Sequence, residues 1–389
     1  MQYAATNNKQ ILTVGIEGTR RFLVPPSNQF APPDHGFNHI PTLGNLYFFG
    51  RVGLLENSED EIHFYEINLK NAGLNEAARW TNLPQGFGYL HSVYGTHSLT
   101  AETIRSLRLL AVSHLLGGEL LDEEGCQSSL LSRVLIHAAT TARYNVYLAE
   151  GRDHYDVNGR VAYESLFNLD GSYRRSGAAQ GYSPFTTWMR GLAWTLLGFS
   201  ELLEFLDIIP ASEFFSHGGK AHVLKQFLKT AKATADFYIQ HTPTDGVPYW
   251  DSGAPNLKYL KDFLDRPAEP FNPHEPVDSS AAAIAAQGLI RLGNYLKEAQ
   301  DKKAGSYYLT AGLTVAKTIF SEQYISSAIK HQGLLLHSAP YYPFSNNPNY
   351  KASKIPNGES CTWGDYHTLE LALLIHRMAL GRYYTFFGL

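Results

Sequence analysis

Cysteine and charge are both scarce in this sequence. Two cysteines, Cys126 and Cys361, occur among 389 residues, which is too few for a disulfide framework and forms no paired metal-ligand motif. Charged residues make up 17% of the chain and the net charge is −4, so there is no broad basic surface for nucleic acid or anionic lipid. No run approaches the roughly 20 apolar residues that span a bilayer. We therefore expect neither nucleic acid nor a membrane as a partner.

Signals for targeting, linkers and several enzyme classes are also missing. The polar N-terminus, residues 1–10, has no charged-then-apolar signal sequence, so we expect a cytoplasmic protein. No Pro/Ser linker or charge run divides residues 1–389, which predicts a single domain. There is no Gly-rich phosphate loop and no Gly-x-Ser-x-Gly elbow. The sequence also predicts no metal site, because no zinc motif is formed by His91, His97, His137, His337 and His367.

Most of the chain has the apolar spacing of helices. Apolar residues recur with a period near 3.6 in Ala101–Gly117, Ser128–Tyr147, Thr187–Leu206, His222–Gln240, Ser279–Gln300, Ser306–Ser321 and Tyr366–Leu380. Asp278 or Ser279 is expected to cap one of these helices, and Asp365 another. Long loops recur after alternate helices, which favours a toroid of helical hairpins over a bundle. Strand-like alternation is short, at 145–147 and 160–167 around the turn at 156–159, and predicts a small β-hairpin on a loop.

Aromatic residues are abundant, with 24 Tyr, 21 Phe and 5 Trp. Several lie in loops beside Gly and Pro, including Trp250 and Trp363. Aromatic loops are common in clefts that bind the flat faces of sugars. They are equally common as plugs over a hydrophobic core, so both interpretations stay open.

The segment Gln180–Trp194 carries the clearest sign of a binding site. Arg190 and Trp194 are four residues apart and so project from one face of a helix. A guanidinium beside an indole suits a small ring that bears a carboxylate, because the guanidinium binds the acid and the indole stacks on the ring. The alternative is a buried aromatic cluster with a structural arginine.

Five blocks of sequence resemble the unsaturated glucuronyl hydrolases, glycoside hydrolase family 88. They lie in the order found in that family between about residues 135 and 380, and comprise Gln180–Phe199, Asp245–Pro255, Asp278–Ala286, Gly333–His337 and Trp363–Tyr366. The resemblance implies an all-α (α/α)6 barrel. It also implies hydration of the vinyl ether in a 4,5-unsaturated uronic acid at the end of an oligosaccharide, without a metal or an organic cofactor.

The resemblance also assigns residues to the site. Gln180, Arg190 and Trp194 would bind the substrate, with Trp188 as a less certain neighbour, and Trp250 and Trp363 would supply aromatic surface. Glu164 stands where the family has a pocket histidine. Asp245, Asp251 and Asp278 are expected to cap helices and fix loops through backbone N–H groups.

The catalytic carboxylates of the family have no clear counterparts. The family uses one aspartate in a His-Asp-x-Gly-Phe segment and one in an Asp-x-x-x-Asn helix. Gly86 occupies the first position in the best-matching segment, residues 84–92. Asp34 precedes a Gly-Phe pair but lies far too early in the chain for a simple replacement, and the second segment has no match.

Three groups are candidates to replace the missing acid: Glu164, His337 and Asp122 of the acidic run 122–124. Each also has a structural interpretation, as a solvated hairpin residue, a satisfied histidine and a solvated turn. The first functional hypothesis is a carbohydrate-active enzyme that hydrates an unsaturated uronyl sugar. The alternatives are a repurposed barrel that catalyses an elimination, isomerisation or cyclisation on a non-sugar ligand, and a binding protein without catalysis.

Overall fold

Helices make up most of the chain in the computed structural model, which describes residues 2–23, 35–56, 58–121, 127–340, 358–383 and 385. The α-helices are α1 (Gln2–Thr6), α2 (Lys9–Leu23), α3 (His35–Asn38), α4 (Asn45–Arg51), α5 (Glu59–Ala77), α6 (Leu107–Leu115), α7 (Leu130–Tyr144), α8 (Met189–Ile208), α9 (Lys220–Gln240), α10 (Ser279–Glu298), α11 (Lys302–Ile319) and α12 (Thr362–Ala379). A π-helix, η2 (Ile40–Gly44), precedes α4, and a 3-10 helix, η4 (Ala101–Ser106), precedes α6.

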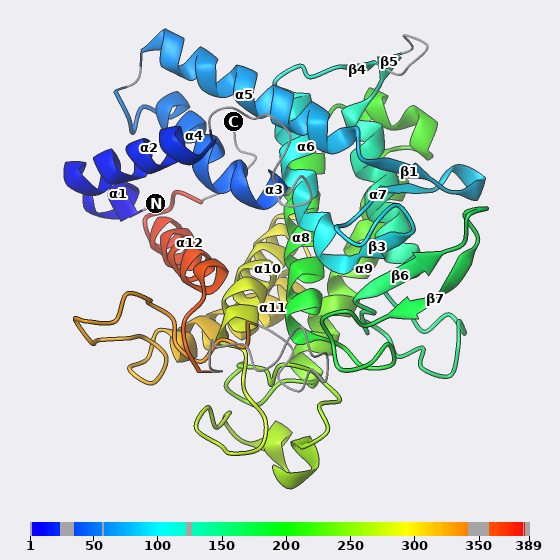
Figure 1. Cartoon of the computed structure of the whole chain (residues 1–389), viewed down its shortest axis with the longest axis vertical. Helices are drawn as coiled ribbons and strands as arrows, with labels where there is room; N and C mark the ends of the chain where they lie inside the picture. The colour runs from blue at the N-terminus through cyan, green and yellow to red at the C-terminus, as the bar shows by residue number, and fades with distance from the viewer. Residues whose placement is uncertain are drawn as a thin grey trace.

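The helices form an inner and an outer layer (Figure 1). Helices α8 and α10 lie side by side in the middle of the view, with α9 packed on α8 and α11 packed on α10. Helix α12 contacts α10 and also α1, so the C-terminal helix joins the N-terminal part of the chain. Helices α5 and α6 pair in the same way, and α6 contacts α7. This arrangement is the helical toroid that the sequence predicts.

Burial follows the position of each helix in the two layers. Nearly every residue of α8 and α10 is buried, as expected for helices that are covered on all sides. Helix α11 buries only Gly305, Tyr308, Gly312, Val315, Ala316 and Ile319. Apart from the adjacent pair Val315 and Ala316, these positions are three or four residues apart, so they form a single stripe. The stripe faces α10, so α11 is an outer helix.

Helix ends confirm part of the capping logic and correct another part. The carboxylate of Asp278 accepts hydrogen bonds from the backbone N–H groups of Ser280 and Ala281, as predicted for a cap of α10. Helix α12, however, begins at Thr362, so Asp365 lies inside its first turn. Asp365 instead accepts hydrogen bonds from the N–H groups of Leu334 and Leu335 at 2.8–3.1 Å. It fixes a neighbouring loop rather than the helix start.

Short strands flank the helices on one side. The pairs are β1 (Trp80–Asn82) with β2 (Gly88–Leu90), β4 (Leu120–Leu121) with β5 (Gln127–Ser128), and a sheet in the order β3 (Ser98–Thr100), β6 (Glu164–Phe167) and β7 (Tyr173–Gly177). The predicted pairing around residues 156–159 is present only as a bridge between Val146 and Val161. The predicted strand 160–167 forms its main hairpin with β7 instead, because residues 173–177 supply a longer partner.

Gly159 allows the turn before β6 to approach the outer helix α9. Its φ of 81° lies in the left-handed region, and a Cβ atom there would be 1.9 Å from the carbonyl oxygen of Ala233. We expect Gly159→Ala to lower the free energy of unfolding by at least about 2 kcal/mol, because it adds a backbone clash to the conformational strain. Chemical denaturation would measure the loss.

Gly151→Ala is the matched control for this substitution. Gly151 has a φ of 80° but nothing within 4 Å of the added Cβ. It should therefore show only the conformational strain of about 1 kcal/mol. Equal losses in the two variants would contradict the close packing of Gly159 on α9.

Candidate functional site

A cavity of about 540 Å³ lies at the end of the barrel where η4, α8 and α12 begin. It is lined by Phe37, Asn38, Pro41, Thr42, Glu102, Arg105, Arg108, Gln180, Trp188, Arg190, Trp194, Pro340, Thr362, Trp363, Tyr366 and His367. All of the predicted substrate-binding residues except Trp250 are in this set. We call this cavity the mouth pocket.

Arg190 is tied into the wall of the mouth pocket. Its Nη1 donates to Asp278 at 2.8 Å and to the carbonyl oxygen of Ala339 at 2.8 Å, and its Nη2 donates to the carbonyl oxygen of Pro340 at 2.9 Å. The guanidinium carbon lies 4.6 Å from the ring centre of Trp188 and 5.0 Å from that of Trp363. The side chain is only 4% exposed. The structural interpretation of Arg190 therefore describes these contacts better than a carboxylate clamp.

Replacing Arg190 tests this structural role. We expect Arg190→Leu to lower the free energy of unfolding by about 3–5 kcal/mol, because it leaves the buried carboxylate of Asp278 without its cation. Arg20→Leu is the control, since Arg20 pairs with Glu61 at a site where its side chain is 54% exposed and should cost less than about 1 kcal/mol. Urea unfolding of both variants would decide. Similar losses would show that Arg190 does not organise the wall.

Three tryptophans give the mouth pocket its aromatic surface. Trp194 lies edge-on to Phe37 at 5.2 Å and to His367 at 5.0 Å between ring centres. Trp188 lies edge-on to Tyr163 at 5.2 Å. Trp363 is partly exposed, and its indole N–H donates to the Ser280 hydroxyl at 3.2 Å. These three rings border the cavity.

Trp250 does not contribute to this pocket. It is 1% exposed, belongs to the hydrophobic core, and donates its indole N–H to Glu275 at 2.8 Å. The loop whose composition suggested a binding residue therefore covers the hydrophobic core. The neighbouring Asp251 has the loop-fixing role that the sequence predicts, since it accepts from the N–H groups of Tyr182 and Gly253 at 2.8–2.9 Å.

Two of the three proposed replacement acids, Glu164 and His337, are not in the lining of the mouth pocket. Glu164 is buried in the β3–β6–β7 sheet and accepts a hydrogen bond from the Ser98 hydroxyl at 2.6 Å. His337 is buried between the rings of Phe271 and Tyr324, and burial lowers its pKa. It borders a separate cavity of about 210 Å³. Asp122, with the rest of the run 122–124, lies outside the described residues.

Glu102 is the carboxylate that the sequence pattern missed. It lies on η4 in the lining of the mouth pocket. Its Oε1 accepts a hydrogen bond from the phenol of Tyr163 at 2.9 Å, and that phenol oxygen accepts one from the Gln180 amide at 3.1 Å. Burial and the charge of Glu102 raise the pKa of Tyr163 well above its usual value, so the phenol stays protonated as a donor. The three side chains form one hydrogen-bonded row.

The segment around Phe37 reaches the same pocket. Gly36 packs so tightly on η4 that a Cβ atom would lie 2.2 Å from the Cα of Ser106, and Phe37 contacts Trp194. Asp34 itself lies outside the described residues. Gly86 lies in an exposed turn between β1 and β2 and is not in the lining. The Gly-Phe pair near the pocket is therefore residues 36–37, not the pair in the segment around Gly86.

Paired charges underlie the mouth pocket. Arg105 binds Glu201, and Arg108 lies 3.4 Å from Glu370. Burial alone would raise the pKa of Glu201, but the guanidinium groups of Arg105, Arg108 and Arg291 hold that pKa below its usual value. These side chains are nearly inaccessible, so they form a rigid floor in which positive and negative charges alternate.

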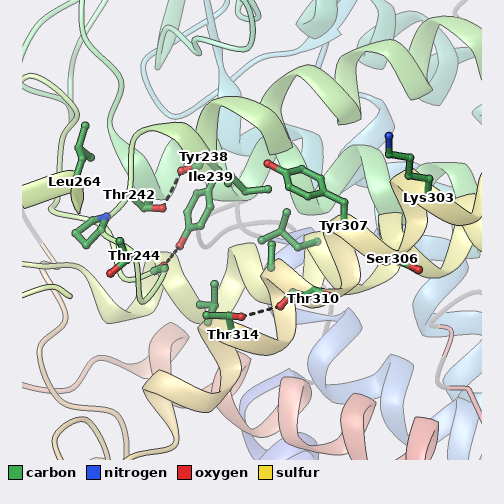
Figure 2. Close-up of a pocket in the computed structure, with 15 residues that line it drawn as sticks. Tyr238, Ile239, Thr242, Thr244, Leu264, Lys303, Ser306, Tyr307, Thr310 and Thr314 are labelled. Carbon is green, nitrogen blue, oxygen red and sulfur yellow. Dashed lines mark hydrogen bonds between the residues drawn. The ribbon is translucent and has the colours of Figure 1, made fainter. Parts of the chain in front are cut away.

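A second cavity, of about 620 Å³, lies outside the inner ring between α9 and α11 (Figure 2). Its hydroxyl groups are used locally: Tyr238 donates to the carbonyl oxygen of Gly246, and Thr242 and Thr314 donate to carbonyl oxygens one helical turn earlier. Lys303 is the charged residue in its lining. The lining contains no carboxylate or imidazole beside Lys303, so this cavity offers no acid–base pair.

Neither a metal site nor a membrane span is found in the described part of the chain. No group of three or more His, Cys, Asp or Glu side chains there is arranged to hold a metal ion. No helix among the described residues is long and apolar enough to cross a bilayer.

Comparisons with known proteins agree with the architecture. No family model matches the sequence. The unsaturated glucuronyl hydrolase of Formosa agariphila is 27% identical over 237 residues, which cover 60% of this chain and 46% of that enzyme. The Bacillus sp. GL1 enzyme is 26% identical over 55% of this chain and 46% of its own length. The chain thus matches about half the length of these curated relatives.

Solved structures match over a larger part of the chain. The unsaturated glucuronyl hydrolase of Bacillus sp. GL1 aligns with 99% of this chain and 85% of its own, with a TM-score of 0.70 and 20% identity. The Streptococcus agalactiae enzyme aligns with 99% and 80%, with a TM-score of 0.69 and 20% identity. The protein is unsaturated glucuronyl hydrolase-like. Its fold is the (α/α)6 barrel that the family resemblance implies.

The spacing of residues around Glu102 can be compared with the family pattern that had no match in the sequence. Glu102-Thr-Ile-Arg-Ser106 has the spacing of the Asp-x-x-x-Asn segment for which the sequence offered no match, with a carboxylate at the first position and a small polar residue at the last. Glutamate and serine stand where the pattern has aspartate and asparagine, so a search for the exact pattern does not detect this segment. A search for any carboxylate four residues before a polar side chain would have found it.

Proposed function

We propose that this protein is a carbohydrate-active enzyme that hydrates the double bond of an unsaturated uronyl sugar. The observation that carries this proposal is the carboxylate of Glu102 in an aromatic pocket, hydrogen-bonded through Tyr163 to Gln180. Support also comes from a variant of the Streptococcus agalactiae enzyme, which aligns with 95% of this chain at a TM-score of 0.60 and is complexed with dGlcA-GalNAc6S. Trp188, Trp194 and Trp363 would bound the sugar ring, and Arg190 would hold the wall behind it.

The reaction needs one group that donates a proton and then accepts one. The carboxylic acid of Glu102 would protonate C4 of the unsaturated ring, and water would add to C5, where positive charge develops. The Glu102 carboxylate then takes a proton from that water, so the acid is regenerated. The resulting hemiketal opens at the ring oxygen and leaves C1 as a hemiacetal, which releases the rest of the oligosaccharide.

The row formed by Gln180, Tyr163 and Glu102 would keep the catalytic group in place. Tyr163 is 3% exposed and donates to Glu102, while Gln180 donates to the oxygen of Tyr163. A carboxylate held by a fixed donor loses little orientation when the substrate binds. Tyr163 is therefore a positioning residue, and Glu102 is the residue that touches the reacting carbon.

Removing the carboxylic acid tests the proposed reaction. We expect Glu102→Gln to slow turnover by at least about 100-fold, because the amide cannot transfer the proton. The measurement is the loss of ultraviolet absorbance when purified protein is incubated with a panel of unsaturated uronyl disaccharides, since hydration destroys the conjugated vinyl-ether acid.

Asp236→Asn is the matched control for the Glu102 variant. Asp236 also accepts a hydrogen bond from a tyrosine, Tyr308, at 2.8 Å, but it lies on the outer helix α9. It should leave turnover unchanged. No absorbance loss with folded wild-type protein would overturn the hydrolase proposal and favour a repurposed or purely binding barrel. Full activity in Glu102→Gln would overturn the role of Glu102 alone.

Tyr163→Phe tests the positioning of Glu102. A donated hydrogen bond stabilises a carboxylate relative to its acid, so its loss should keep the catalytic acid protonated to higher pH. We expect the alkaline limb of the rate–pH profile to move up by about one pH unit, and kcat to fall about tenfold as orientation is lost. Tyr308→Phe, which removes the matching bond to Asp236, should change neither. An unshifted profile in Tyr163→Phe would rule out the coupling.

A further inference from the structure

The mouth pocket raises the question of how it would bind an acidic group. Its three arginines are each paired with a buried carboxylate: Arg105 with Glu201, Arg108 with Glu370, and Arg190 with Asp278. A buried arginine that already has such a partner contributes little net positive charge. Glu102, the remaining acidic residue in the described lining, offers no positive charge to an incoming carboxylate.

His367 is placed differently from the arginines. It lies on α12 in the pocket lining, with its ring edge-on to the indole of Trp194. The Gln287 amide nitrogen lies 3.0 Å from Nδ1 and 3.0 Å from the backbone oxygen of His367. The same nitrogen lies farther, 3.4 Å, from the carbonyl oxygen of Ala283, so we infer that one amide hydrogen serves the carbonyl of His367 and the other serves Nδ1. With Nδ1 as an acceptor, the proton of the neutral ring is on Nε2.

Burial is the main reason that this ring is neutral. Burial lowers the pKa of His367 to about 4; Glu370 opposes this effect, while the charges of Arg105 and Arg108 add to it. Glu370 lies 3.3 Å from Nδ1, but its other oxygen accepts from Tyr366 at 3.0 Å and lies near Arg108. Among the described residues, Nε2 has no hydrogen-bond partner, so its N–H is available to a molecule in the pocket.

We propose that His367 is a specificity-determining residue that binds the acidic group of the substrate through its neutral Nε2–H. This inference rests on the proposed function, because the substrate named there carries a carboxylate on the ring that Trp194 would border. A donor on α12 holds that carboxylate without competing for the arginines of the floor. It also holds the carboxylate at a different element from η4, which carries Glu102. Gln287 is the positioning residue, since it selects the ring tautomer.

Comparing the affinities for an acid and for its ester distinguishes a carboxylate-binding role of His367 from a general packing role. The probes are an unsaturated uronyl disaccharide and its methyl ester, titrated calorimetrically at pH 7. We expect His367→Leu to weaken binding of the acid about tenfold or more, because a hydrogen bond to a charged group is lost, and to change ester binding less than threefold. His367→Gln, which keeps a side-chain N–H, should retain most of the preference for the acid.

Further variants guard against a folding defect. Thermal unfolding of each variant comes first, and if His367→Leu does not fold, Gln287→Leu takes its place. It should weaken acid binding in the same direction and move the ¹⁵N resonances of His367 away from the Nε2–H tautomer. Tyr307→Phe, in the cavity between α9 and α11, is the control and should change neither affinity.

The outcomes distinguish this inference from the proposed function. Turnover of the disaccharide with an unchanged acid-to-ester ratio in His367→Leu overturns the role of His367 and leaves the function standing. Binding without turnover in the wild type overturns the function, while the acid-to-ester ratio still supports or contradicts His367. If the wild type binds neither probe, both proposals are overturned.

Discussion

Asp278 joins three parts of the chain at the wall of the mouth pocket. One of its oxygens accepts from the N–H groups that begin α10, and the other accepts from Arg190 of α8. Arg190 also binds the carbonyl oxygens of Ala339 and Pro340. A buried carboxylate and a buried guanidinium are costly unless both are satisfied, so these contacts must form together. The positions of Trp188 and Trp363 beside the guanidinium follow from this ion pair.

The same constraint governs the floor of the pocket. Arg105, Arg108 and Glu370 are buried, and each lies against a group of opposite charge. A floor of this kind is rigid and nearly neutral overall, so we expect recognition to depend on other side chains of the lining. His367 and the row ending in Glu102 are such features, one a neutral donor and the other a carboxylate whose position is fixed by Tyr163. Charge pairing thus shapes both the wall and the chemistry of the site.

Local sequence was a good guide to the helices and a poorer guide to the site. Helices α8 and α10 were predictable because each has a wide stripe of apolar residues, and because Asp278 caps α10. Trp250 was misleading, because a Pro-Tyr-Trp loop has the same composition whether it covers a core or lines a cleft. Glu102 was missed because residues 101–106 resemble the first turns of a longer helix, whereas they form a separate 3-10 segment. Its neighbours Tyr163 and Gln180 are more than 60 residues away in the chain.

The sequence by itself determined the helical periodicity, the cap at Asp278 and the set of aromatic and polar residues around Arg190, because these depend on neighbours within a few positions. Only the tertiary structure decided what those residues contact. It paired Arg190 with Asp278, buried Trp250 and Glu164, and brought Glu102 and His367 into one pocket. The physical reason is that burial and ion pairing are set by packing between elements far apart in the chain, and a buried charge accepts only the partner that packing places beside it.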